Sequence, residues 1–67
     1  MTKVFYVVEV RFFDGSTNVF QEAFPSLAAA QAFCAGREDN PAKIDEFSYR
    51  SLIHGYSIHS VYVRGDV

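Results

Sequence analysis

The side chains that could do chemistry are few. His54, His59 and Cys34 could together bind a metal ion or form a Cys–His nucleophile pair, in which the imidazole takes the thiol proton. His54 and His59 are five residues apart, so on one strand they would point to opposite faces. No fourth ligand has a recognisable position in the sequence. We therefore expect structural or surface roles for both histidines, with no metal and no cofactor.

Cys34 lies in a segment rich in alanine, on the same helical stripe as Leu27, Ala30 and Phe33. A cysteine on an apolar stripe is usually a small buried hydrophobic residue. Because Cys34 is the only cysteine, it cannot form an internal disulfide, and one unpaired thiol is typical of a reducing compartment. We expect a buried thiol and a cytoplasmic protein. An enzyme that uses Cys34 or His59 is the least favoured function.

One segment, residues 37–46, is rich in charge, although Arg37 and Lys43 dilute its acidity. Its four carboxylates belong to Glu38, Asp39, Asp45 and Glu46. Two interpretations stay open. The segment is either a solvated connector or a contact for a basic partner surface, toward which acidic groups would steer association.

Familiar catalytic motifs are missing from the sequence. The four glycines are far apart, so they form no phosphate-binding loop. The segment Asp14-Gly15-Ser16 indicates a turn and not a nucleophile elbow, because no helix follows it directly. No pair of carboxylates has a spacing that fixes acid–base geometry. The sequence therefore predicts a protein that is not an enzyme.

Two extended segments at the start of the chain, Val4–Phe13 and Thr17–Phe24, predict a β-hairpin with its turn at Asp14-Gly15. In the first segment one face is wholly apolar, and it contains Val4, Tyr6, Val8, Val10 and Phe12. The other face is mixed, and it contains Lys3, Phe5, Val7, Glu9, Arg11 and Phe13. The apolar face should therefore join the core.

The length of the hairpin loop decides where Phe20 and Phe24 lie. A two-residue loop would put them on the mixed face, and a three-residue loop would put them beside Tyr6 and Val10. Burying two phenylalanine side chains stabilises the fold by roughly 1.5–3 kcal/mol each. We therefore expect the odd-length loop, with Gly15 in the left-handed conformation.

A helix is predicted over Leu27–Ala35, with Ser26 as its N-cap and Gly36 as a left-handed stop. Asn40-Pro41 is typical of a second helix start, so segment 41–54 is predicted to contain a short helix. A strand over 47–53 remains the alternative, because the apolar residues there also alternate.

Tyr56–Val63 predicts the last strand. Its apolar residues change face along the strand, which indicates either a bulge near Ser60 or partial burial of both faces. The fold class is therefore α+β. We expect a single domain over residues 1–67, in which an antiparallel sheet of about three strands follows the order β-β-α-(α)-β and one face is covered by helix.

Composition limits the classes of partner. The formal net charge is −2, and the six cationic residues are scattered, so no basic patch for nucleic acid is expected. No apolar stretch approaches the roughly 20 residues of a membrane span, and no signal peptide is recognisable. A chain of 67 residues buries a small core, and its sequence predicts neither a disulfide nor a bound metal ion to stabilise it. A homodimer is another way to stabilise such a domain.

In a sheet with helix on one side only, the mixed face of the first strand meets water. Phe5, Val7 and Phe13 lie on that face, and exposed apolar patches often mark interaction sites. The sequence does not decide between this face and the acidic segment as the contact surface.

The order of elements resembles that of small phage-encoded host-takeover and anti-CRISPR proteins. The segments that carry the resemblance are Phe5–Phe12, Asp14-Gly15, Val19–Phe24, Ser26–Ala35 and Ile58–Val63. The resemblance implies an inhibitor in the host cytoplasm that binds and blocks a bacterial defence or nucleic-acid-processing complex. The alternative is a small homo-oligomeric structural or accessory subunit.

Overall fold

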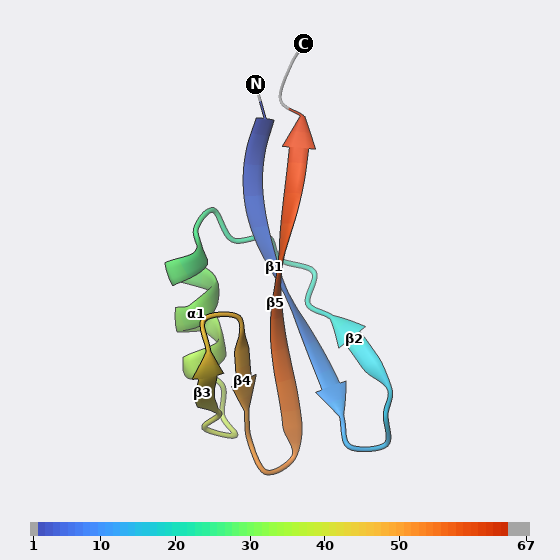
Figure 1. The fold of residues 1–67 in the computed structure, drawn as a ribbon. Helices are drawn as coiled ribbons and strands as arrows, with labels where there is room; N and C mark the ends of the chain where they lie inside the picture. Colours follow the sequence, from blue (N-terminus) through green and yellow to red (C-terminus); the bar gives the residue numbers. More distant parts are fainter. Residues whose placement is uncertain (1, 65–67) are drawn as a thin grey trace.

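The computed structural model describes residues 2–64, which form one antiparallel sheet of five strands and a single helix (Figure 1). The elements are β1 (Thr2–Phe12), β2 (Thr17–Val19), α1 (Leu27–Ala35), β3 (Ala42–Asp45), β4 (Ser48–Arg50) and β5 (His54–Arg64). The strand order is β2-β1-β5-β4-β3, so the first and last long strands lie side by side in the middle. The expected α+β fold with about three strands is therefore wrong, because the chain is mostly sheet.

The error lies in segment 41–54, which forms β3 and β4 and no helix. Asn40 has φ of 52°, a left-handed conformation that turns the chain and does not cap a helix. The alternative, a strand over 47–53, has the right type, but β4 covers only Ser48–Arg50, and neither interpretation predicted β3. The strand is favoured because Tyr49 then pairs with Tyr56 in the core, where it is 7% exposed. That burial outweighs the local helix signal at Asn40-Pro41.

The hairpin register agrees with the prediction. Val10 pairs with Asn18, and the loop between Phe12 and Ser16 has three residues, the last of which is Gly15 with φ of 93°. Beyond β2 the chain stays beside β1, since the Phe24 and Tyr6 backbones exchange hydrogen bonds of 2.8 and 2.9 Å. Phe24 is therefore buried in the core, and Phe20 packs against that core.

The helix begins and ends where the sequence predicts. The Ser26 hydroxyl accepts a hydrogen bond from the Ala29 N–H at 3.1 Å, as an N-cap should. The left-handed stop is wrong, because Gly36 has φ of −88°. The Gly36 N–H instead donates to the Ala32 carbonyl and completes the last turn.

The core lies between α1 and one face of the sheet. It contains Val8, Val10, Phe24, Ala30, Cys34, Tyr49, Tyr56 and Ile58. Arg37 packs at the edge of the core. Its guanidinium lies over the rings of Phe20 and Phe33, 4.9 and 5.2 Å from their centroids, in cation–π contacts. Aromatic packing thus supplies much of the cohesion of this small core.

The expected bulge near Ser60 is absent, because β1 and β5 pair without interruption from Thr2↔Arg64 to Phe12↔His54. The other expectation, that both faces are partly buried there, holds in part, because Tyr56 and Ile58 are buried on one face and Val61 and Val63 are more than half covered on the other. Val61 and Val63 point away from the core face and are 39% and 43% exposed. The change of apolar face marks the point where β5 leaves the region that α1 covers.

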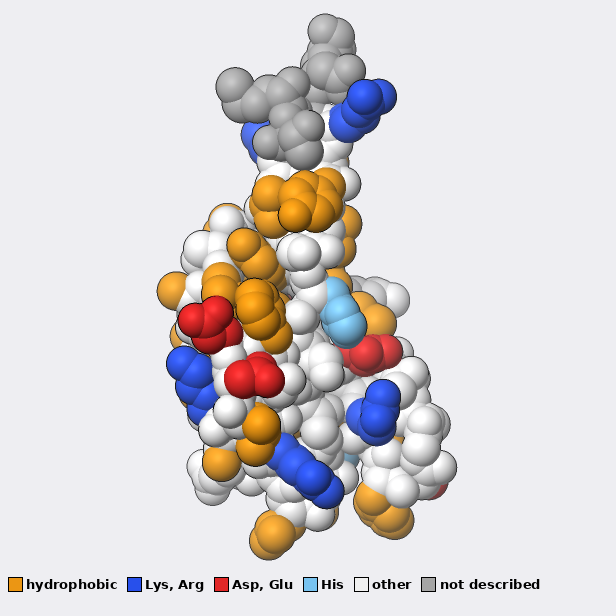
Figure 2. All heavy atoms as spheres, viewed as in Figure 1, with side chains coloured by type: hydrophobic (Ala, Val, Ile, Leu, Met, Phe, Trp, Pro, Cys, Tyr) orange, Lys and Arg blue, Asp and Glu red, His pale blue; other side chains and the backbone are white. Residues whose placement is uncertain are grey.

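Beyond that point, β1 and β5 continue together as a two-stranded ribbon, which we call the arm (Thr2–Phe5 and Val61–Arg64). Figure 1 shows it projecting past the rest of the sheet, and the structure extends 44 × 22 × 18 Å. In the space-filling view, hydrophobic side chains gather on the arm (Figure 2). Within residues 2–64, no helical segment has the length and apolar character needed to cross a membrane.

Candidate functional site

The face of the sheet opposite α1 carries no second layer in the part of the chain that the structure describes, and we call it the open face. The continuous β1–β5 register places the odd-numbered residues of both strands on it. Two features lie on the open face. One is an apolar strip on and below the arm, and the other is a cleft between two arginines near the opposite end of β5.

The apolar strip consists of Phe5, Val7, Val61 and Val63. Phe5 pairs directly with Val61, and its side chain is half-buried, as is that of Val7. The structure therefore brings together two of the three apolar residues that the sequence singled out. The third, Phe13, lies apart in the hairpin loop and is 92% exposed.

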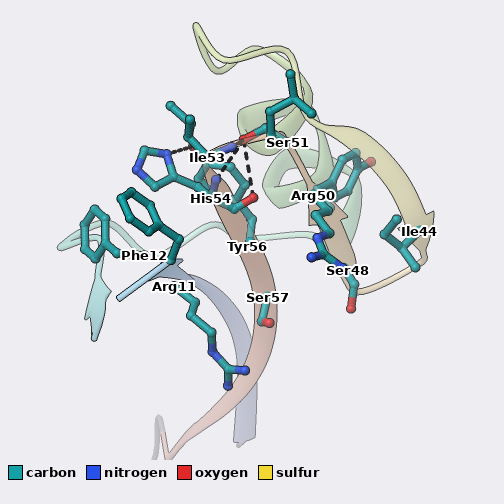
Figure 3. Close-up of a pocket in the computed structure, with 14 residues that line it drawn as sticks. Arg11, Phe12, Ile44, Ser48, Arg50, Ser51, Ile53, His54, Tyr56 and Ser57 are labelled. Carbon is teal, nitrogen blue, oxygen red and sulfur yellow. Dashed lines mark hydrogen bonds between the residues drawn. The ribbon is translucent and has the colours of Figure 1, made fainter. Parts of the chain in front are cut away.

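The second feature is a row of three residues across the sheet. Gly55 on β5 pairs with Arg11 on β1 and with Arg50 on β4. We call the space between the two arginine side chains the arginine cleft. Figure 3 shows Arg11 and Arg50 on opposite sides of β5, and the groove that they line has a volume of about 470 Å³.

The floor of the arginine cleft is empty. A Cβ atom added to Gly55 would have no neighbour within 4 Å. In the next row Ser57 pairs with Ser48, which places two hydroxyl groups beside the arginines. Sequence reasoning missed this site. The available signal was Gly55 itself, because a glycine inside a strand marks a bulge, a bend or a place where a ligand or another backbone approaches closely.

The nearby carboxylate on the open face does not neutralise the arginines. Glu9 precedes Arg11 by one row, but its Oε1 lies 3.0 Å from Nε2 of His59. Within residues 2–64, no carboxylate lies within ion-pair distance of the Arg11 or Arg50 guanidinium. Two guanidinium groups therefore flank the groove, and neither forms an ion pair with a carboxylate of residues 2–64.

The acidic segment does not form one patch. Glu38 is exposed, and Asp45 and Glu46 are exposed at the β3–β4 turn, where the Asp45 carboxylate accepts the Phe47 N–H. Asp39 turns inward, and its side chain is 12% exposed. The structure therefore separates Asp39 from the other three carboxylates.

Asp39 is the centre of a hydrogen-bond network that ties the connector before β3 to β5. Its carboxylate accepts hydrogen bonds from the Ser51 hydroxyl at 2.5 Å and from the Tyr56 hydroxyl at 2.9 Å, and it lies 3.2 Å from Nδ1 of His54. The Ser51 hydroxyl donates to the Asp39 carboxylate and lies 3.3 Å from the His54 backbone carbonyl, but it makes no hydrogen bond to the His54 ring. These three residues therefore do not have the geometry of a catalytic triad. The network therefore has a structural role, since it joins the connector before β3 to β5.

The environment of Asp39 shifts two acid–base equilibria. Burial raises the pKa of Asp39, but the hydrogen bonds from Ser51, Tyr56 and His54 outweigh it, and the net pKa is lowered. Burial, with the negative Asp39 nearby, raises the pKa of the Tyr56 hydroxyl. Both shifts favour an ionised Asp39 that accepts hydrogen bonds from the protonated hydroxyls of Ser51 and Tyr56.

Cys34 is fully buried, as the sequence predicts. Burial raises the pKa of its thiol to about 11, so the thiol stays protonated at neutral pH. His54 and His59 also lie apart, on opposite faces of β5. Within residues 2–64, no three His, Cys, Asp or Glu side chains are placed to hold a metal ion.

The open face therefore offers apolar contact area at one end and guanidinium donors at the other. Such surfaces can bind a partner, since arginine and aromatic residues are enriched in protein interfaces. Comparisons with protein-family models, with curated proteins and with solved structures found no match to this chain.

Proposed function

We propose that the protein is a non-catalytic binding module that docks onto another protein through the open face of its sheet. The observation that carries this proposal is the apolar strip. Val61 and Val63 are more than one-third exposed there, next to Phe5 and Val7. Contiguous apolar area on a protein surface marks an interaction site more often than scattered single residues do.

The proposed partner is a protein or protein complex of a bacterial cell. An inhibitor of this kind, the class that the order of elements resembles, acts in the host cytoplasm by occupying a surface that its target needs. Such a role requires no catalytic group, only a rigid face. The sheet provides one, because its two central strands pair over eleven residues each.

The proposal is tested by placing a charge in the apolar strip. In a pull-down from bacterial lysate, Val61→Glu and Phe5→Glu are each expected to weaken capture of the stoichiometric partner about tenfold or more, because a carboxylate would be desolvated in the contact. Mass spectrometry identifies the captured partner, and a titration with that purified partner gives the affinity.

Ala28→Glu is the matched control. It adds the same charge at an exposed position of α1, on the other side of the sheet. The control should keep the affinity of the original protein. Equal weakening by all three variants, or no stoichiometric partner at all, would reject docking through the open face.

A second candidate function, a homo-oligomeric accessory subunit, is favoured by the arm. An isolated two-stranded ribbon is marginally stable in water. The arm carries an apolar pair on each face, Val4 with Tyr62 on one and Phe5 with Val61 on the other. Tyr62 is 71% exposed, so a second copy of the chain would bury substantial aromatic area there.

Sedimentation velocity across the micromolar range separates the two candidates. A subunit that pairs through its arm is expected to sediment as a dimer, and Tyr62→Glu should raise the dimer dissociation constant about tenfold or more. Thr17→Glu, at an exposed position of β2, is the control. A monomer at every concentration would reject the accessory-subunit function.

A further inference from the structure

We propose that the arginine cleft binds carboxylate groups of an acidic, partly apolar peptide segment in a partner protein. This inference deepens the proposed function and rests on it, since it names the chemistry of the partner. It concerns a different part of the open face from the apolar strip, so each can be tested separately.

The geometry of the row suits a carboxylate. Neighbouring strands lie about 4.8 Å apart, so the Arg11 and Arg50 backbones, with Gly55 between them, are separated by roughly 10 Å. Arginine side chains are long enough to converge across that gap. Each guanidinium can donate two parallel hydrogen bonds to one carboxylate. The missing side chain at Gly55 leaves room for that group above the strand.

The hydroxyls of Ser48 and Ser57 lie in the same groove and can donate further hydrogen bonds to a bound oxyanion. The Glu9 carboxylate does not compete at ion-pair distance, because it is held by His59. A negative ligand would therefore meet four donor side chains in a site whose cations have no ion-pair partner within residues 2–64.

The rim of the cleft indicates a peptide and not an inorganic anion. Four apolar side chains border it, Phe13, Ile44, Leu52 and Ile53, and each of them is about half or more exposed. Apolar side chains of a bound segment would cover them and gain the contact area that a small anion cannot provide.

The small number of cations in the cleft favours an acidic peptide over a nucleic acid as the ligand. A phosphate backbone requires a broad basic surface, and its affinity grows with the number of phosphates neutralised. The cleft contains two cations. The rest of the open face carries the carboxylates of Glu9 and Asp45 and one further cation, Lys3, and the chain has a net charge of −2. An acidic segment with few carboxylates fits this arrangement better than a polyanion does.

The test uses synthetic peptides in which glutamate alternates with leucine. NMR titration of the ¹⁵N-labelled protein is expected to shift the amide of Gly55 and the side-chain Nε–H signals of Arg11 and Arg50. A peptide with glutamine in place of glutamate should bind about tenfold or more weakly, since it lacks charge-assisted hydrogen bonds. An oligodeoxythymidylate should bind more weakly than the acidic peptide.

Variants assign the binding to the cleft. Arg11→Gln and Arg50→Gln are each expected to weaken binding of the acidic peptide about tenfold or more. Gly55→Thr should do the same by filling the floor, in a fold that accepts the added Cβ. Lys43→Gln is the control, because it removes an equal charge from the exposed strand β3.

Several results would overturn the proposal. They are equal binding of the glutamine peptide, unchanged affinity of both arginine variants, or tighter binding of the oligonucleotide. Amide spectra of each variant show whether the fold is kept. If the arginine variants still capture the cellular partner and Val61→Glu does not, the inference fails while the proposed function stands.

Discussion

Phe24→Ala is expected to lower the free energy of unfolding by about 3–5 kcal/mol, because the substitution leaves a cavity in a core that has few other large residues. Phe24 is 8% exposed and lies 5.1 Å from the Phe33 ring, centroid to centroid. A domain of this length has a total stability of about 3–10 kcal/mol, so the loss is a large fraction of the total. Urea denaturation followed by circular dichroism measures the loss.

Phe13→Ala is the control, since the same atoms are removed from a side chain that is 92% exposed. Its free energy of unfolding should change by less than about 0.5 kcal/mol. If Phe24→Ala leaves no folded protein, Phe24→Leu gives a smaller loss that can be measured. A loss no larger than that of the control would contradict the hairpin register.

That register could be predicted from the sequence because a one-residue slip has a large cost. Shifting the hairpin by one residue would expose both Phe20 and Phe24, whereas the three-residue loop ending at Gly15 buries Phe24 and packs Phe20 against the core. The helix over Leu27–Ala35 was predictable for a similar reason, because a cap, a run of helix formers and a glycine agree locally.

The strands β3 and β4 could not be predicted in the same way. Their local signals conflict: Asn40-Pro41 is typical of a helix start, while Phe47, Tyr49 and Ile53 alternate as in a strand. The conflict is decided by pairing of Tyr49 with Tyr56, a contact that only the assembled sheet creates. Short strands depend on their neighbours more than on their own residues.

The candidate site was only half predictable. Phe5 and Val7 follow from alternation along one strand, so the sequence indicates their common face. The arginine cleft requires β1, β5 and β4 to be adjacent, and Arg11 and Arg50 are 39 residues apart in the sequence (50 − 11). No pattern within either strand reveals that Gly55 lies between them. The inward turn of Asp39 depends on the same tertiary assembly.

Asp39→Ala is expected to lower the free energy of unfolding by about 2–4 kcal/mol, because it leaves the Tyr56 hydroxyl without its charged acceptor and removes one acceptor of Ser51. Denaturation measures the loss. Glu38→Ala removes the adjacent carboxylate, which is exposed, and should cost less than about 0.5 kcal/mol. Equal losses of unfolding free energy in the two variants would show that the hydrogen bonds of Asp39 do not stabilise the fold.

The pH dependence of Asp39→Asn gives a sharper test, since the amide keeps the shape but carries no charge. The pKa of Asp39 is lowered in the folded state, so its ionised form stabilises the fold fully above the usual carboxyl pKa of about 4. That contribution is lost as the pH falls through the folded-state pKa. The original protein should therefore lose more stability in acid than Asp39→Asn does, and the two should converge at low pH. Asp14, whose pKa is also lowered, is present in both proteins and cancels from the difference. A stability difference that does not change with pH would show that Asp39 does not act through its charge.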